Sequence, residues 1–218
     1  MAHPLPPHGD MVDAIVATYR RASFAQLHDG ENWYAVARNI VYTIAAETTT
    51  DPGRIACALA ALSPRNPWAW SVADVYAFAS SAALGGEMPT ATTYGANRRT
   101  AWRALTSDGV PWTDAALKVR AFVGAIMGNE WSVVVDVWAV RVVTGGELSE
   151  AKSTGLYRRI AHAYTEAANI LGVTPCTVQA VTWLVAQSEG LGSGRRSRHD
   201  QTCKRGTHAF VRRLLDVT

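Results

Sequence analysis

The stretch KVRAFVGAIMGNEWSVVVDVWAVRVV, residues 118 to 143, places one acidic side chain inside an apolar run. Asp136 stands between SVVV and VWAV, and an ionised carboxylate is costly to bury without partners. The residues after it have the spacing of one apolar helix face: Trp138, Ala139, Val142 and Val143. The pattern predicts that Asp136 is the N-cap of a helix and accepts backbone N–H groups of its first turn. Such a cap does not exclude chemistry, because it also holds the carboxylate rigidly.

Helical periodicity extends from this stretch in both directions. Apolar residues recur at helical spacing in nine segments: 11–27, 32–48, 51–64, 66–84, 93–105, 113–128, 131–146, 157–172 and 174–190. Asp51 with Pro52 has the composition of a helix start, and Pro64 of a stop. Thr113 or Asp114 is the predicted cap of the helix that contains Lys118. SVVVDVWAVRVV is the one β-like run and cannot form a sheet alone, so the sequence predicts an all-α fold with eight or nine helices.

The 218 residues are 48% apolar and 18% charged, which is typical of a globular chain with a substantial core. We expect a disordered N-terminus (1–10), a helical domain (11–190), a basic flexible loop (191–206) and a C-terminal helix (207–218). The chain shows neither a signal peptide nor an apolar stretch of membrane-spanning length. Three scattered cysteines and no HxxxH spacing predict reduced thiols, no metal site, no metal cluster and no cofactor. We therefore expect a cytoplasmic monomer.

Charge is distributed unevenly along the chain. The net charge is +3, yet residues 190–218 carry seven Lys/Arg against two Asp, so this tail is +5 and the remainder about −2. A basic tail on a near-neutral body predicts a polyanionic partner such as DNA. The alternative is a solvated tail that only improves solubility.

Lys118 is surrounded in the sequence by apolar residues: Leu117, Val119, Phe122 and Val123. A lysine beside such a face is usually a surface residue whose stem covers apolar neighbours. Its functional alternative is an amine nucleophile with a lowered pKa.

Lys118, Gly128, VVVD ending at Asp136, and Arg141 together resemble the motif of the helix-hairpin-helix DNA glycosylases, the endonuclease III and oxoguanine glycosylase superfamily. The segments AALSPRNPWAWSVADVYAF (60–78) and YGANRRTAWRAL (94–105) resemble two further family segments in the expected order. The resemblance covers roughly residues 35–145 and implies a two-lobed helical fold. The C-terminal part resembles small phage and actinobacterial proteins, which would place a phage-encoded chain in the host cytoplasm.

The chain departs from the family at two sites. The family's glycine-rich hairpin grips a DNA phosphate, whereas the matching place here reads WTDAALKVRA and has no glycine. The four-cysteine cluster of the endonuclease III branch is also missing from this sequence.

The resemblance implies a set of site residues. Asp136 would be the catalytic carboxylate and Lys118 the nucleophile, while Arg65 and Asn66 would form the wedge that enters the DNA stack. Contacts to phosphates would come from Arg98, Arg99, Arg103, Arg120, Arg195, Arg196 and Arg198. Gln179, Trp183 and Trp138 would line the base pocket. For Gln179 and Trp183, which lie four residues apart, the alternative is a core tryptophan with a hydrogen-bonding glutamine beside it.

Three functions remain open at this point. The first is a DNA glycosylase, with or without lyase activity, acting on a flipped modified or damaged base. The second is a phage base-hypermodification transferase acting on hydroxymethylated pyrimidine. The third is a DNA-binding protein without catalysis, which the missing hairpin favours.

Overall fold

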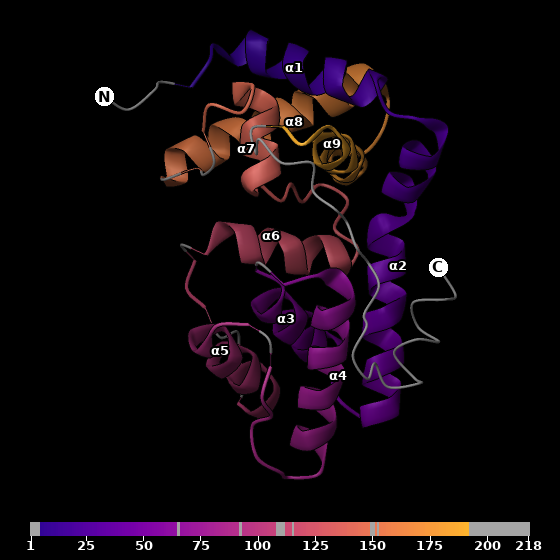
Figure 1. Ribbon diagram of the computed structural model, residues 1–218, viewed down its shortest axis with the longest axis vertical. Coiled ribbons are helices and arrows are strands. Elements are labelled where there is room, and N and C mark those ends of the chain that lie inside the picture. Colours follow the sequence, from indigo (N-terminus) through magenta and orange to yellow (C-terminus); the bar gives the residue numbers. More distant parts are fainter. Residues whose placement is uncertain are drawn as a thin grey trace. The chain divides into compact units, whose positions relative to one another are not determined.

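The computed structural model describes residues 5–64, 66–91, 93–107, 112–114, 116–148, 151 and 153–191. Within them the secondary structure is entirely helical, which confirms the predicted all-α class. The helices are α1 (His8–Arg20), α2 (Phe24–Thr48), α3 (Pro52–Leu62), α4 (Trp68–Ala83), α5 (Gly95–Thr106), α6 (Leu117–Ile126), α7 (Val137–Thr144), α8 (Thr154–Leu171) and α9 (Pro175–Glu189). Figure 1 labels each of them. The predicted loop at 191–206, apart from Leu191, and the predicted helix at 207–218 lie outside the described residues.

The described chain divides into two compact units. Unit 1 contains the described residues up to 35 and from 120 onward, and unit 2 contains residues 36–119. The sequence had suggested one helical domain over 11–190.

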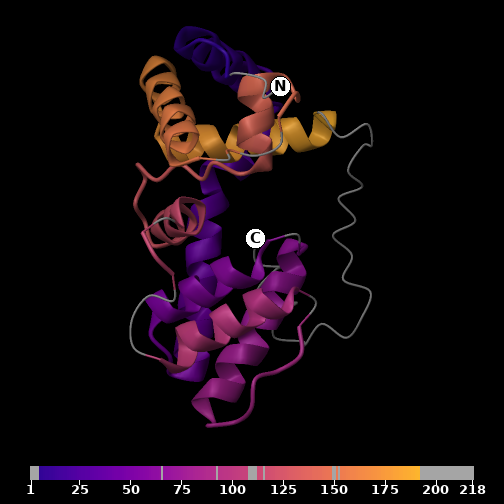
Figure 2. The same ribbon diagram turned by 90° about the vertical axis from the view of Figure 1, so that its left-hand side faces the viewer.

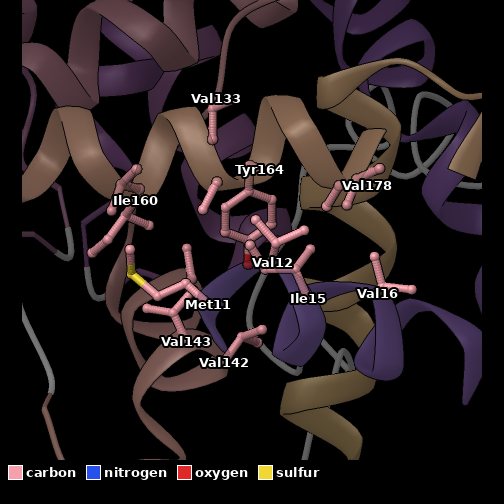
Figure 3. Close-up of a cluster of buried hydrophobic side chains, with 14 of the residues drawn as sticks. Met11, Val12, Ile15, Val16, Val133, Val142, Val143, Ile160, Tyr164 and Val178 are labelled. Carbon is pink, nitrogen blue, oxygen red and sulfur yellow. The ribbon is translucent and has the colours of Figure 1, made fainter. Parts of the chain in front are cut away.

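The core of unit 1 is formed where α1, α7, α8 and α9 pack together (Figures 1 and 2). Figure 3 shows side chains from these helices converging on the buried ring of Tyr164: Met11, Val12, Ile15, Val142, Val143, Ile160 and Val178. The phenolic oxygen of Tyr164 shares a hydrogen bond of 3.2 Å with Oγ1 of Thr182, which is also buried. The hydroxyl of Tyr164 is therefore satisfied, as a buried hydroxyl requires.

In unit 2, α3 packs against α4 and α5. Its alanine-rich face allows close approach, and the buried residues are Ile55, Ala56, Ala58, Leu59, Ala60, Ala61 and Leu62. Asp51 caps α3 as predicted, because its carboxylate accepts the N–H of Arg54 at 3.0 Å. The rings of Phe78 and Trp102 meet edge to face at 6.1 Å and join α4 to α5.

Several predicted boundaries are wrong. The first predicted segment, 11–27, extends past the end of α1 at Arg20, and α2 begins at Phe24 rather than at residue 32. Helix α1 begins at His8 rather than at residue 11, because Met11 donates its N–H to the carbonyl of Pro7 and its side chain is buried. Helix α6 begins at Leu117, later than the start that the sequence predicts after Thr113 or Asp114. The carbonyl of Thr113 instead accepts the N–H of Ala116 in a preceding turn.

No single helix in the described ranges has both the length and the apolarity to cross a membrane. Helices α8 and α9 meet those criteria only as a pair, which is bent by 100°.

Candidate functional site

Asp136 of unit 1 is the N-cap of α7, as the sequence predicts. Its Oδ1 accepts the backbone N–H of Trp138 at 3.0 Å and that of Ala139 at 2.9 Å, while its own carbonyl accepts the N–H of Val140. The residue has extended backbone (φ −96°, ψ −172°) and is partly buried. Two N–H donors and the start of the helix dipole stabilise the negative charge here. The carboxylate is held in one orientation by the backbone itself.

Tyr157 of α8 fixes the extended segment that delivers Asp136. Its hydroxyl donates to the carbonyl of Val133 at 2.8 Å and accepts the N–H of Val135 at 3.3 Å. Val133 and Val135 are both buried. The phenol of Tyr157 thereby makes the two hydrogen bonds to the backbone that a neighbouring strand would make in a sheet.

The loop before this segment is attached to the start of α9. The backbone N–H of Cys176 donates to the carbonyl of Glu130 at 3.1 Å, and its thiol donates to the carbonyls of Ser132 at 3.1 Å and Asn129 at 3.4 Å. Helix α6 approaches the same loop closely, since a Cβ on Gly124 would lie 2.7 Å from Oγ of Ser132. The loop at 129–132 is therefore held by Cys176 of α9, and the segment at 133–135 is held by Tyr157 of α8.

Three tyrosines lie within electrostatic reach of this carboxylate: Tyr34 and Tyr164, which are buried, and Tyr157, which is partly buried. Burial raises the pKa of Tyr157 to about 12, and the negative charge of Asp136 adds to that rise. Burial likewise raises the pKa values of Tyr34 and Tyr164, with Asp136 contributing to each. All three phenols are consequently neutral at physiological pH and can donate hydrogen bonds.

Trp138 follows Asp136 on α7 and is partly exposed. The guanidinium of Arg141, one turn further along, lies 4.8 Å from the centre of its ring. This cation–π contact orients the ring of Trp138, while the backbone N–H of the same residue donates to the carboxylate of Asp136.

Comparison with known families finds a match over residues 7–190, which takes in Asp136 and all the helices of the described part of the chain. The chain belongs to the DUF7178 family. That family is described as one of unknown function. No curated protein matches the chain. No solved structure matches it either. The basic residues Arg195, Arg196 and Arg198 lie beyond the stretch that matches DUF7178, and also outside the described residues.

Gln179 and Trp183 of this DUF7178 chain are engaged inside unit 1. Gln179 is only 4% exposed, and its Oε1 accepts the hydroxyl of Tyr34 at 2.6 Å. Trp183 packs on Trp33 with ring centres 4.8 Å apart. These contacts match the core alternative for the pair, except that the partner of the glutamine is Tyr34. Of the three residues predicted for a base pocket, Trp138 is the one that lies two residues from Asp136 and donates its backbone N–H to that carboxylate.

Lys118 is exposed in the first turn of α6 and belongs to unit 2, whereas Asp136 belongs to unit 1. Its exposure agrees with the surface alternative for this lysine. The catalytic pairing of Lys118 with Asp136 stays a prediction.

The basic residues predicted to contact phosphates differ in exposure. Arg99 and Arg103 on α5 and Arg120 on α6 are exposed. Arg98 is partly buried, and its Nη2 donates to the carbonyl of Pro89 at 3.0 Å. Arg98 therefore holds the segment before α5 in place, while Arg99 and Arg103 are exposed residues of α5.

The two predicted wedge residues can be placed only in part. Asn66 donates through its side chain to the carboxylate of Asp74 at 3.1 Å and through its backbone to the carbonyl of Ser63. Arg65 lies outside the described residues. Asn66 thus has a local role at the turn between α3 and α4.

Sequence reasoning missed Tyr34, Tyr157 and Cys176, which surround or anchor the Asp136 segment. No local signal marks them, because each acts on residues far away in the chain. A tyrosine on an amphipathic helix and a cysteine after a helix-starting proline are unremarkable in the sequence alone.

Proposed function

We propose that this protein is a DNA base-processing enzyme of the glycosylase type, with Asp136 as its catalytic carboxylate. The observation that supports this most is the fixed geometry of Asp136 at the start of α7, partly exposed and held by two backbone N–H groups. A carboxylate in a preorganised position is what a reaction with a developing positive charge requires.

A base inside a duplex is out of reach, so the target nucleotide must be flipped out of the stack. As the glycosidic bond breaks, positive charge develops on the sugar. The carboxylate of Asp136 would stabilise that charge or activate the attacking water. Since Oδ1 is held by Trp138 and Ala139, the carboxylate would need little reorganisation during the reaction.

Trp138 supports the same proposal. Trp138 is partly exposed, lies two residues after Asp136 in the first turn of α7, and has the guanidinium of Arg141 over its ring. Aromatic side chains stack on extruded bases with about 1–3 kcal/mol each. Trp138 is accordingly the proposed stacking surface, while Gln179 is buried and accepts the hydroxyl of Tyr34.

Positive charge supports a nucleic-acid substrate. Arg99, Arg103, Lys118 and Arg120 are exposed on α5 and α6 and would contact phosphates. In this proposal Lys118 has a second possible role, attack on the sugar carbon to form a Schiff base, which would add strand cleavage to base removal.

The test uses duplex and single-stranded oligonucleotides that contain damaged, abasic or hydroxymethylated pyrimidines, with and without borohydride. Asp136→Asn is the decisive variant, because asparagine caps a helix about as well as aspartate and only the charge is lost. Asp10→Asn, which removes an exposed carboxylate from α1, is the matched control. We expect Asp136→Asn to slow base release by about 100-fold or more, and Asp10→Asn to have no effect.

Lys118→Ala resolves the lyase step, with Arg120→Ala as a charge-matched neighbour. A borohydride-trapped adduct that disappears in Lys118→Ala alone would establish a bifunctional enzyme. Base release without an adduct would establish a monofunctional glycosylase. If no base is released from any substrate, the glycosylase proposal fails, and mass analysis of the oligonucleotides would then separate base modification from binding alone.

A further inference from the structure

A second group of chemically capable side chains lies on α1 and α8 of unit 1, and it involves none of the residues proposed for base processing. His8, His162 and Glu166 direct one ligand atom each toward a common point, with all three atoms within 4.8 Å of one another. Nε2 of His8 lies 2.7 Å from Oε2 of Glu166. The rings of the two histidines have centres 4.9 Å apart and are tilted by 36°.

The backbone keeps these three groups together. His162 and Glu166 lie four residues apart on α8 and so share one face of that helix. His8 is the first residue of α1, which packs on α8 through the core that contains Met11, Ile15 and Ile160 (Figure 3). The three ligands are therefore presented by two helices that a common core holds side by side.

These three donor atoms match the preference of a divalent metal ion of intermediate softness. Two imidazole nitrogens and one carboxylate oxygen suit Zn²⁺, which binds nitrogen at about 2.0–2.1 Å and oxygen at about 2.0–2.2 Å. A tetrahedron with such bonds places its ligand atoms about 3.3 Å apart. The present separations reach that value with small side-chain rotations, during which the bond between His8 and Glu166 is replaced by bonds to the metal.

Charge favours the same occupant. The N-terminus of α1 repels a cation, but the carboxylate of Glu166 opposes that effect directly at the site. His8 is partly buried, whereas His162 and Glu166 are exposed, so an ion could enter from solvent.

We propose that His8, His162 and Glu166 form a binding site for a divalent transition metal, with Zn²⁺ as the reference ion. Three protein ligands leave one coordination position for water or for a group on another molecule. The bound ion ties the first turn of α1 to α8 and stabilises unit 1.

The test is calorimetric titration of ZnCl₂ into the full chain after treatment with a chelator, followed by Co²⁺ titration monitored by visible absorption. We expect one equivalent of Zn²⁺, a tetrahedral Co²⁺ spectrum and a higher Tm with metal. His162→Ala and Glu166→Gln should each weaken binding by more than about tenfold, since even outer-shell partners of a metal contribute that much. Glu166→Gln retains an acceptor for His8 and so preserves the fold.

Two controls separate this site from other histidines. His28→Ala removes an exposed histidine that lies 3.4 Å from Asp29, and it should bind Zn²⁺ as the unchanged chain does. A combined variant, His3→Ala, His199→Ala and His208→Ala, removes the histidines outside the described residues and should also retain one equivalent. The proposal is overturned if the unchanged chain takes up no Zn²⁺, if His162→Ala and Glu166→Gln bind normally, or if the combined variant loses the site.

Discussion

The hydroxyl of Tyr157 donates to the carbonyl of Val133 across 24 residues of chain, at a distance of 2.8 Å. Together with the N–H of Val135, which it accepts, this contact satisfies two polar groups of an extended segment that forms no sheet. The same contact also fixes the extended segment that leads directly to Asp136, the N-cap of α7.

Tyr157→Phe should therefore destabilise the protein although it retains the ring. Both valines are buried, so their backbone groups would lose a partner where water is scarce. We expect a loss of about 1–3 kcal/mol in the free energy of unfolding, measured by urea denaturation. Tyr42→Phe removes the same oxygen from an exposed tyrosine and should change stability by less than about 0.5 kcal/mol. Equal effects of the two variants would show that the Val133 contact contributes nothing.

Asp136→Ala and Asp136→Asn separate the cap from the charge. Alanine removes the acceptor for the N–H groups of Trp138 and Ala139 and should cost about 0.5–2 kcal/mol. Asparagine offers an oxygen in the same place and should have stability close to that of the unchanged chain. Urea denaturation of the three proteins measures both effects. A loss in Asp136→Asn as large as in Asp136→Ala would mean that the charge, rather than the cap, stabilises α7.

Gly30→Ala tests the contact between α2 and α9 within unit 1. A Cβ at this position would lie 2.4 Å from Cγ2 of Val181 and 2.9 Å from its Cα and N atoms. Backbone atoms cannot rotate aside, so we expect a loss of about 1–3 kcal/mol. Thermal denaturation should show a lowered Tm that the added change Val181→Ala does not fully restore, because the Cα and N atoms of residue 181 remain in place.

Gly9→Ala is the matched control for that substitution. Gly9 lies in the first turn of α1, with no atom near its would-be Cβ. Alanine there should stabilise the protein by about 0.4–1 kcal/mol, because it lowers the conformational entropy of the unfolded chain. A stabilised Gly30→Ala would show that the two helices can separate without cost.

Stability should fall as the solution becomes alkaline. Burial raises the pKa of Tyr157 to about 12, and burial is also the largest cause of the raised pKa values of Tyr34 and Tyr164. An unfolded tyrosine releases its proton near pH 10, so above that pH the folded state binds more protons than the unfolded state. The contribution of Tyr157 is fully present below about pH 10 and is lost as the pH rises to about 12.

Urea denaturation at several pH values from about 9 to 11 measures this dependence, and absorbance at the tyrosinate band reports ionisation directly. Tyr157→Phe should show a shallower decline above pH 10 than the unchanged chain, by up to about 1.4 kcal/mol per pH unit. A parallel decline in both proteins would mean that Tyr157 ionises normally in the folded state.

The part of the site that sequence could predict is the part built from neighbours in the chain. Asp136 caps the helix that begins one residue later, and Asp51 caps α3, because capping joins a side chain to N–H groups two or three residues on. Gly172 ends α8 with φ +70°, a backbone conformation that glycine adopts freely. The start of α1 was not predicted correctly because it depends on residues far away in the chain. Burial of Met11 against other helices outweighs the proline-rich composition of residues 1–9.

What the sequence by itself determined is the helical class and the caps at Asp51 and Asp136, since periodicity and capping act over one or two turns. What only the tertiary structure decided is which distant residues meet. Tyr34 reaches Gln179, Tyr157 reaches Val133, and His8 reaches Glu166 across 145, 24 and 158 residues of chain. These meetings depend on how apolar helix faces pack in a shared core, and packing selects partners by shape and burial rather than by position in the sequence.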